Sequence, residues 1–216
     1  MTVVLHGYQY SVYLRIARLA LAEKGVAYER VEVNPFAPEL PEAYLAMHPF
    51  RRVPVLVHDS FVLYETGAIT RYVDETFAGP RLQPEAPRER ARMTQIISIV
   101  DSYAYWPMVR QVFSHAVFRP RIGEPVDPAA ITQGLEGSTR ALGALEAIAA
   151  GGEFLVGRQL SLADLHFAPM VAYFTAAPDA RGVIPGYPKL ATWWQAMQCR
   201  ESLAATDPGL PSRDRN

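Results

Sequence analysis

Three short segments in the first 70 residues carry the side chains best suited to binding and activating a small molecule. The first, GYQYS, places the hydroxyls of Tyr8, Tyr10 and Ser11 between a predicted strand and a predicted helix. A helix N-terminus presents unpaired N–H groups and about half a positive charge, so it stabilises an anion bound there. The alternative is that Ser11 simply caps the helix, a role that its side chain suits well.

The second segment, RRVPV, places Pro54 at the start of a predicted strand. A cis Val53–Pro54 bond would turn the backbone of Val53 outward, where its N–H and C=O could pair with an extended ligand as an added strand would. The alternative is an ordinary trans proline that opens a strand, and base rates favour it because only about 5% of such bonds are cis.

The third segment, YETG, joins the end of a strand to the start of a helix at Glu65 and Thr66. A carboxylate and a hydroxyl beside free helix N–H groups could bind an ammonium and a carboxylate together, as an amino-acid moiety requires. The alternative is an acidic first turn that stabilises the helix through its dipole.

The elements that must position these segments alternate between strand and helix. Strands are predicted over residues 2–7, 28–33, 53–58 and 61–64, and helices over 14–24, 41–47 and 65–77. The order βαβαββα predicts a small four-stranded α+β domain over residues 1–78. Glycine and proline cluster in residues 79–87, which are therefore predicted to be a linker.

The remaining residues, 88–216, are predicted to form an all-α helical bundle. Helices are expected over 88–118, 129–150, 161–177 and 190–197, and Pro107 is expected to kink or break the first of them. Ser161 and Asp164 have the spacing of a capping box, which predicts a folding role for the pair. Three arginines between residues 88 and 92 are interpreted as a solvated helix face.

The composition narrows the range of functions. The chain has 216 residues, 50% of them hydrophobic, and a formal net charge of −1. This balance excludes a mostly disordered chain and an overall field that attracts nucleic acid or anionic lipid. No apolar run approaches the roughly 20 residues that span a bilayer, and no secretory signal is recognised, so a cytoplasmic protein is expected.

Cysteine and histidine usage argues against redox and metal chemistry. Cys199 is the only cysteine, so neither an intrachain disulfide nor a CxxC pair is possible. The five histidines show no ligand spacing such as HExxH, so no metal site is expected.

The order of the motifs resembles the glutathione transferase family. A hydroxyl-bearing loop is followed by KG at residues 24–25, HPF before RRVPVL, YETGAI, a proline-containing linker and finally GRQLSLAD. The resemblance spans residues 1 to about 205. It implies a thioredoxin-like N-terminal domain that binds glutathione and an all-helical C-terminal domain that shapes the pocket for an electrophile.

The resemblance also implies roles for the first segment. Ser11 matches the catalytic serine of the theta-, delta- and zeta-like classes. Tyr8 and Tyr10 remain alternatives, because tyrosine-using classes place their hydroxyl near the end of the first strand. The electrophile pocket is expected to involve Tyr10 together with residues of the first long helix of the second domain. Those residues are Tyr103, Trp106 and Arg110.

The glutathione subsite is assigned in the same way. Val53 matches the residue whose backbone pairs with the cysteinyl part, and Pro54 matches the family's cis proline. Glu65 and Thr66 match the acid and the hydroxyl that hold the γ-glutamyl group. Arg52 occupies the position that helps to hold the glycyl carboxylate.

The sequence departs from the family pattern at two positions. His48 stands where many members have Asn, and Gly67 stands where many have Arg. Phe50 corresponds to an aromatic residue that inserts between partner helices in some classes.

The resemblance therefore predicts a cytoplasmic, homodimeric glutathione transferase of detoxification. It would join glutathione to a small apolar electrophile, with glutathione as a substrate and no cofactor. A glutathione-dependent isomerase, dehalogenase or peroxidase on the same fold is the first alternative. A transferase-like binding module without catalysis is the second.

Overall fold

The computed structural model describes residues 2–211, and residues 1 and 212–216 of the predicted domains lie outside this range. The described chain divides into two compact units. The first runs to Arg81 and also includes Ala205–Pro208. The second comprises Leu82–Ala204 and continues from Gly209.

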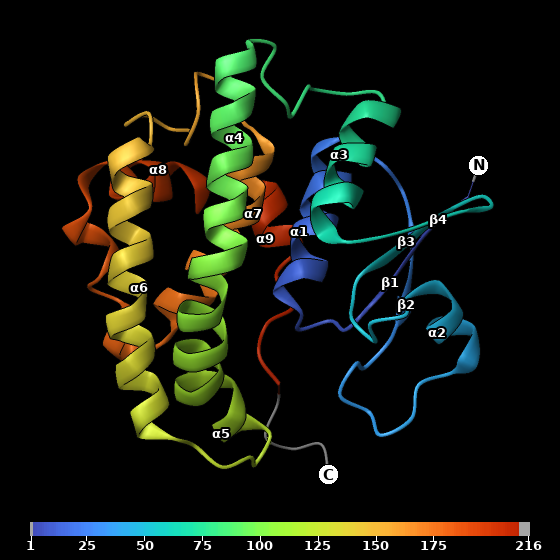
Figure 1. The fold of residues 1–216 in the computed structure, drawn as a ribbon, viewed down its shortest axis with the longest axis horizontal. Coiled ribbons are helices and arrows are strands. Elements are labelled where there is room, and N and C mark those ends of the chain that lie inside the picture. The colour runs from blue at the N-terminus through green and yellow to red at the C-terminus, as the bar shows by residue number, and fades with distance from the viewer. Residues whose placement is uncertain (1, 212–216) are drawn as a thin grey trace. The chain divides into compact units, whose positions relative to one another are not determined.

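The first unit is a mixed sheet with helices (Figure 1). Its elements are β1 (Val3–Gly7), α1 (Val12–Glu23), β2 (Glu29–Glu32), α2 (Glu42–Met47), β3 (Val55–His58), β4 (Phe61–Tyr64) and α3 (Thr66–Thr76). The strand order is β2-β1-β3-β4, in which β2 runs parallel to β1 while β3 and β4 are antiparallel to their neighbours. The predicted order βαβαββα and the thioredoxin-like fold are thus confirmed.

Successive side chains of the central strands point to opposite faces of the sheet. Leu56 of β3 is fully buried, and so are Leu14 and Ile16 of α1 and Ile69 of α3. The preceding residue, Val55, packs instead in a cluster with Tyr44 of α2 and Val33. Because neighbouring strand residues point to opposite faces, α1 and α3 cover one face and α2 the other, as Figure 1 shows.

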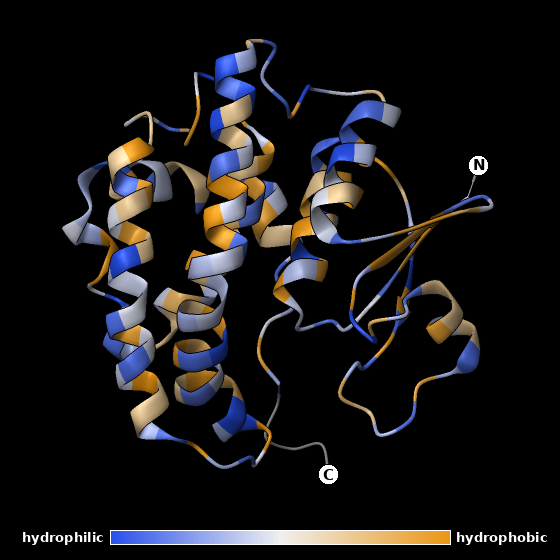
Figure 2. Ribbon diagram, viewed as in Figure 1, coloured by the Kyte–Doolittle hydropathy of each residue, from blue (hydrophilic) through white to orange (hydrophobic). Residues whose placement is uncertain are grey.

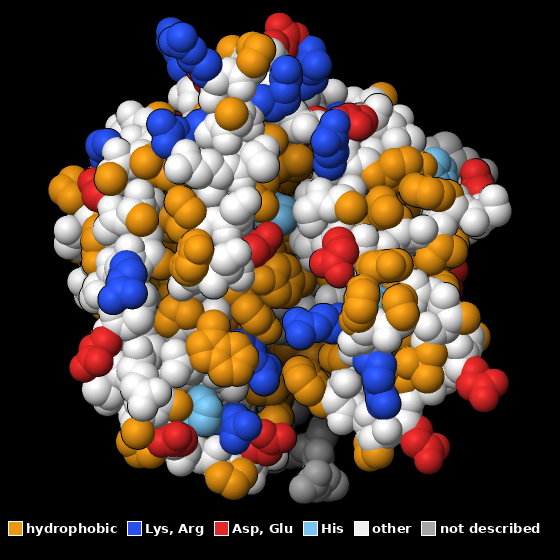
Figure 3. Space-filling view, in the orientation of Figure 1, with side chains coloured by type: hydrophobic (Ala, Val, Ile, Leu, Met, Phe, Trp, Pro, Cys, Tyr) orange, Lys and Arg blue, Asp and Glu red, His pale blue; other side chains and the backbone are white. Residues whose placement is uncertain are grey.

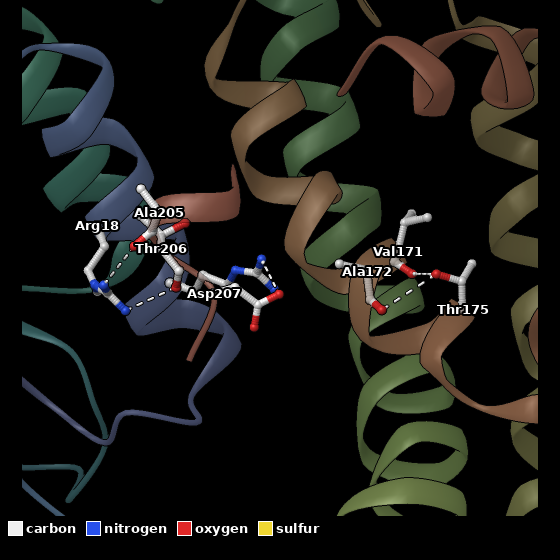
Figure 4. Close-up of polar contacts among 8 residues, drawn as sticks. Arg18, Val171, Ala172, Thr175, Ala205, Thr206 and Asp207 are labelled. Carbon is white, nitrogen blue, oxygen red and sulfur yellow. Dashed lines mark hydrogen bonds and ion pairs between the residues drawn. The ribbon is translucent and has the colours of Figure 1, made fainter. Parts of the chain in front are cut away.

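A segment from the far end of the chain is bound to α1 of this unit. Arg18 donates from Nη1 to the carbonyl of Thr206 at 3.0 Å and from Nη2 to that of Ala205 at 3.5 Å (Figure 4). Arg15, whose side chain is 2% exposed, forms an ion pair with Asp207 at 3.2 Å. These contacts attach residues 205–208 to the first unit.

The second unit is helical, which confirms the predicted bundle. Its elements are α4 (Pro87–Ile99), the π-helices η1 (Val100–Ala104) and η2 (Trp106–Phe118), α5 (Arg119–Arg121), α6 (Pro128–Ile148), α7 (Leu162–Ala176), the 3₁₀ turns η3 (Pro178–Ala180) and η4 (Ile184–Gly186), α8 (Pro188–Met197) and α9 (Glu201–Ala205). Helix α7 is buried on almost every side and is hydrophobic around its circumference, so it forms the core of the unit.

Of the kink or break predicted at Pro107, the break is wrong. The chain remains helical to Phe118, and the change from α to π geometry begins at Val100, before the proline. We attribute the continuation of the helix past Pro107 to the wider π turn, because it relieves the clash between a proline ring and the carbonyl of the preceding turn. Helix α6 approaches closely here, since a Cβ on Gly134 would lie 2.7 Å from the Pro107 carbonyl oxygen. Only glycine fits at that contact.

The start of α4 is a solvated face, as its sequence indicates. Arg88, Arg90 and Arg92 are exposed. The first turn of the helix is hydrophilic in Figure 2, and basic side chains gather over it in Figure 3. Within residues 2–211, no helix combines the length and the apolar character needed to cross a membrane.

Candidate functional site

Ser11 begins α1 and caps it. Its backbone is extended (φ −71°, ψ 124°), and its Oγ accepts a hydrogen bond from the N–H of Leu14 at 3.3 Å. The capping role does not use up the side chain, because a hydroxyl that accepts one bond can still donate its own proton. The first turn of α1 contains no acidic residue, so no carboxylate there competes with an anion for the helix N-terminus.

Aromatic rings lie beside this helix start. Tyr8 and Tyr10 meet edge-to-face with their centroids 5.5 Å apart, and Tyr8 meets Phe36 in the same way at 5.9 Å. The backbone N–H of Ser11 donates to the carbonyl of Tyr8 at 2.8 Å, which fixes the turn between them. The three rings form one aromatic cluster in the segment that leads to the start of α1 and in the loop after β2.

The Val53–Pro54 bond is cis. The β1–β3 ladder ends at the pair His6–Val55, so the backbone of Val53 lies beyond the ladder and is not engaged in it. The preceding carbonyl, that of Arg52, accepts a hydrogen bond from the hydroxyl of Tyr44 at 2.5 Å. Burial raises the pKa of Tyr44 to about 12, so this donor stays protonated at neutral pH and fixes the segment to α2.

Glu65 adopts an unusual backbone conformation at the start of α3. Its φ of +70° lies in the left-handed region, which costs of order 1–3 kcal/mol for a residue other than glycine. Glu65 is the N-cap of α3, and its side chain makes no capping bond. Its exposed carboxylate is therefore not used to stabilise the helix, whereas Thr66 beside it is buried. Such strain is commonly retained where a binding residue must be aimed.

The register of the sheet brings the three segments to one edge. His6 pairs with Val55, and Val55 pairs in turn with Tyr64. The end of β1, the start of β3 and the end of β4 therefore lie side by side. Ser11 follows the first of these, Val53 and Pro54 precede the second, and Glu65 and Thr66 follow the third. Two helix N-termini, those of α1 and α3, begin at this edge, so it suits a ligand with negative charge at two points.

The close fit of β1 against α1 helps to fix this geometry. A Cβ on Gly7, the last residue of β1, would lie 2.7 Å from a methyl group of Leu14 in the first turn of α1. Absence of a side chain at Gly7 therefore lets the helix begin directly over the strand end.

The residues predicted for the electrophile pocket lie in both units. Tyr10 lies in the first unit. Tyr103 and Trp106 lie on η1 and η2 of the second unit and are 67% and 60% exposed, and Arg110 follows on η2. Large exposed aromatic side chains are available to contact an apolar molecule. Their role in a pocket remains a prediction.

Ser161 and Asp164 form the predicted capping box at the start of α7. The fully buried Asp164 carboxylate accepts from the N–H and Oγ of Ser161 at 2.7 and 2.8 Å. Two further donors were not predicted, namely the N–H of Leu155 at 2.7 Å and Nε1 of Trp193 at 2.9 Å. Burial raises the pKa of Asp164 to about 6, although these hydrogen bonds act in the opposite direction. These bonds join the start of α7 to Leu155 and Trp193 of the second unit, and a folding role outside the site remains the prediction for the pair.

A metal centre finds no support in the described part of the chain. No group of three or more His, Cys, Asp or Glu side chains within residues 2–211 could hold a metal ion.

Comparisons with known proteins identify the family. The model of the glutathione S-transferase N-terminal domain matches residues 5–81, and that of the C-terminal domain matches residues 128–196. Glutathione S-transferase F13 of Arabidopsis thaliana is 31% identical over 214 residues, which cover 97% of each chain. Glutathione S-transferase F10 of the same plant is 32% identical over 188 residues, or 85% of this chain and 86% of that one. The chain belongs to the glutathione S-transferase family.

Solved structures agree. Glutathione S-transferase III in its apo form has a TM-score of 0.84 at 26% identity and covers 98% of both chains. Glutathione S-transferase I bound with lactoylglutathione has a TM-score of 0.82 at 26% identity, covering 96% of this chain and 99% of that one. The F-series relatives point to the phi class, so the theta-, delta- or zeta-like assignment made from the sequence is not confirmed.

Proposed function

We propose that this protein is a glutathione transferase that joins the sulfur of glutathione to a small apolar electrophile. The observation that carries the proposal is the pairing of His6 with Val55 and of Val55 with Tyr64. This register gathers a serine hydroxyl, an unengaged backbone segment, a free carboxylate and two helix N-termini at one edge. Glutathione is a tripeptide with a thiol, an ammonium and two carboxylates. All but the glycyl carboxylate, for which Arg52 is proposed, have a counterpart among these groups.

The γ-glutamyl end of glutathione would bind at the start of α3. The carboxylate of Glu65 would accept hydrogen bonds from the ammonium, and the α-carboxylate would bind at the helix N-terminus beside Thr66. The absence of a capping bond from Glu65 supports this role, because its carboxylate is available to a ligand.

The rest of glutathione would extend along the start of β3. The backbone of Val53, outside the β1–β3 ladder and next to the cis Pro54, would pair with the cysteinyl residue as an added strand does. The exposed guanidinium of Arg52 would bind the glycyl carboxylate.

Ser11 would stabilise the thiolate by donating a hydrogen bond. A free thiol has a pKa of about 8.5, and lowering it by two units requires about 2.7 kcal/mol. A hydrogen bond to a charged group supplies roughly 1.5 to 3 kcal/mol, and a helix N-terminus adds about 0.3 to 1. Together they are sufficient. Tyr8 and Tyr10 are the alternative donors.

The thiolate would then attack the electrophilic carbon, so that a C–S bond forms. In a substitution the leaving group departs with its electron pair, and in an addition the carbanion takes a proton from water. The aromatic surface of Tyr8, Tyr10 and Phe36 supports an apolar second substrate. We include in the proposal the sequence-based expectations of a cytoplasmic homodimer acting in detoxification, and of Tyr103, Trp106 and Arg110 as further contacts to the electrophile.

A conjugation assay with a chromogenic aryl halide tests the proposal, together with the melting temperature in glutathione. Saturable formation of the thioether is expected, and glutathione at 100 times its dissociation constant should add about 2.7 kcal/mol of stability. Stabilisation without conjugation would favour the non-catalytic binding module. Product analysis with isomerisable, halogenated and peroxide substrates would reveal an isomerase, a dehalogenase or a peroxidase.

A further inference from the structure

His48 lies between the two ligand-binding segments of the first unit, although its side chain has no assigned role. It follows α2 directly and is buried, with only 2% of the residue exposed. Its backbone N–H donates to the carbonyl of Tyr44 at 3.0 Å, and its own carbonyl accepts from the N–H of Arg51 at 3.2 Å. The main chain of His48 is thus fixed between α2 and the segment that leads to the cis proline.

The ring of His48 contacts both binding segments. Nδ1 accepts a hydrogen bond from the N–H of Phe50 at 3.4 Å, in the segment before Arg52 and Val53. The ring also meets the ring of Phe50 edge-to-face and stacks on the ring of Tyr64, the latter at a centroid distance of 4.7 Å and an interplanar angle of 28°. Tyr64 immediately precedes Glu65, so the single imidazole of His48 contacts both binding segments.

The protonation state of this ring affects the charges that would bind glutathione. Desolvation by burial lowers the pKa of His48 below its ordinary value, the nearby Glu65 carboxylate raises it, and the Arg52 guanidinium lowers it. The ring is therefore neutral near pH 7, with its proton on Nε2 because Nδ1 accepts from Phe50. Glu65 and Arg52 are also the two charged side chains proposed to bind the opposite ends of glutathione.

We propose that His48 is a positioning residue that joins the two glutathione-binding segments in its neutral form and weakens the site when protonated. This inference rests on the proposed function. Protonation places a proton on Nδ1. Nδ1 can then no longer accept the hydrogen bond from the N–H of Phe50, so that bond is lost. The new positive charge also acts on Glu65, where it competes with the ammonium of the ligand, and it is repelled by Arg52.

Binding of S-methylglutathione tests the inference, because this analogue has no thiol to ionise. Its dissociation constant would be measured calorimetrically between about pH 5 and 7.5, the range in which histidine titrates. For the parent, the constant should rise about 3-fold to 10-fold towards the acid end, since a shift of one unit in a linked pKa corresponds to a factor of ten.

Two variants separate the roles of the ring. His48→Asn retains an oxygen that can accept from Phe50 but cannot gain a charge, so its affinity should be nearly independent of pH. His48→Leu has no acceptor, so it should bind more weakly at every pH and also without a slope. His58→Asn is the matched control, since His58 is another largely buried histidine of the first unit and bonds to Tyr72. It should retain the parent's profile.

The outcomes are distinguishable. A flat profile for the parent, or an unchanged slope in His48→Asn, would overturn the role of His48. Burial raises the pKa of Asp164 to about 6, within the measured range, but Asp164 is present in every variant and so does not affect their difference. If the parent failed to bind S-methylglutathione at about pH 7.5, the proposed function itself would fall, and the role of His48 with it.

Discussion

Replacing Asp164 with asparagine should change how the stability of the protein depends on pH. The folded-state pKa of Asp164 is about 6, against an ordinary value of 3.8. Between these two values the folded protein binds more protons than the unfolded chain, so this group makes the free energy of unfolding fall as pH rises. A difference of roughly two units corresponds to about 3 kcal/mol. The contribution is fully present below about pH 4 and is lost as pH rises past 6.

The Asp164→Asn variant lacks this titration. In the parent, Ser161, Leu155 and Trp193 all donate hydrogen bonds to the carboxylate. The NH₂ group of the asparagine would face at least one of these donors and could not accept its bond. The variant should therefore be less stable than the parent at each pH, by roughly 1–3 kcal/mol or more for the mismatched bonds. The stability of the parent relative to the variant should in addition decline by about 3 kcal/mol between pH 4 and 7.

Denaturant unfolding across this pH range, followed by tryptophan fluorescence, is the assay. The Michaelis constant for glutathione should barely change, since the pair organises the second unit. A parent–variant difference that stays constant, or that grows with pH, would refute the reasoning. A large rise in the Michaelis constant with stability intact would instead place Asp164 in the site.

Three further predictions concern the first unit. Glu65→Gly should weaken glutathione binding about 10-fold to 150-fold by calorimetry. The melting temperature should be equal or higher, because glycine tolerates the positive φ of this position. Unchanged affinity would remove the role of Glu65. Asp207→Asn removes the charged partner of the buried Arg15 and should cost about 1–3 kcal/mol of unfolding free energy, and an unchanged denaturation midpoint would show that the C-terminal segment contributes little. Phe50→Ala should raise a dimer dissociation constant about 30-fold in sedimentation experiments, as expected for loss of an aromatic anchor worth about 2 kcal/mol; no change would exclude Phe50 as that anchor.

Local patterns predicted the elements well, because strand alternation and helical spacing are written in neighbouring residues. The strand 61–64 agrees with β4, and the helix predicted over 161–177 is close to α7. The start of α1 lies at Val12, two residues before the predicted helix start, since Ser11 is the residue that caps it. The capping box was also predictable, because both of its members lie within one helical turn.

Features that depend on distant residues were not predictable in this way. The ion pair between Arg15 and Asp207 joins positions 192 apart, and the bond from Trp193 to Asp164 joins positions 29 apart. Neither has a local signal. The close approach of α6 to Pro107 at Gly134 likewise joins residues that are far apart in the sequence.

The candidate site shows the same division. Its residue types were recognised one segment at a time, and in each segment an ordinary structural role was a reasonable alternative. What brings them together is the register of three strands, at His6, Val55 and Tyr64, which no single segment specifies. His48 was noted only as a departure from the family pattern, because its contacts with Phe50 and Tyr64 exist only in the folded unit.

The most direct test of the central claim is thiolate absorbance against pH in the complex with glutathione. It would be measured for the parent, Ser11→Ala, Tyr8→Phe and Tyr10→Phe. We expect Ser11→Ala to raise the pKa of the bound thiol by about one to two units and to lower turnover about 10-fold to 100-fold, while binding changes little and both tyrosine variants titrate like the parent. A large shift in a tyrosine variant, with Ser11→Ala titrating like the parent, would contradict the serine mechanism.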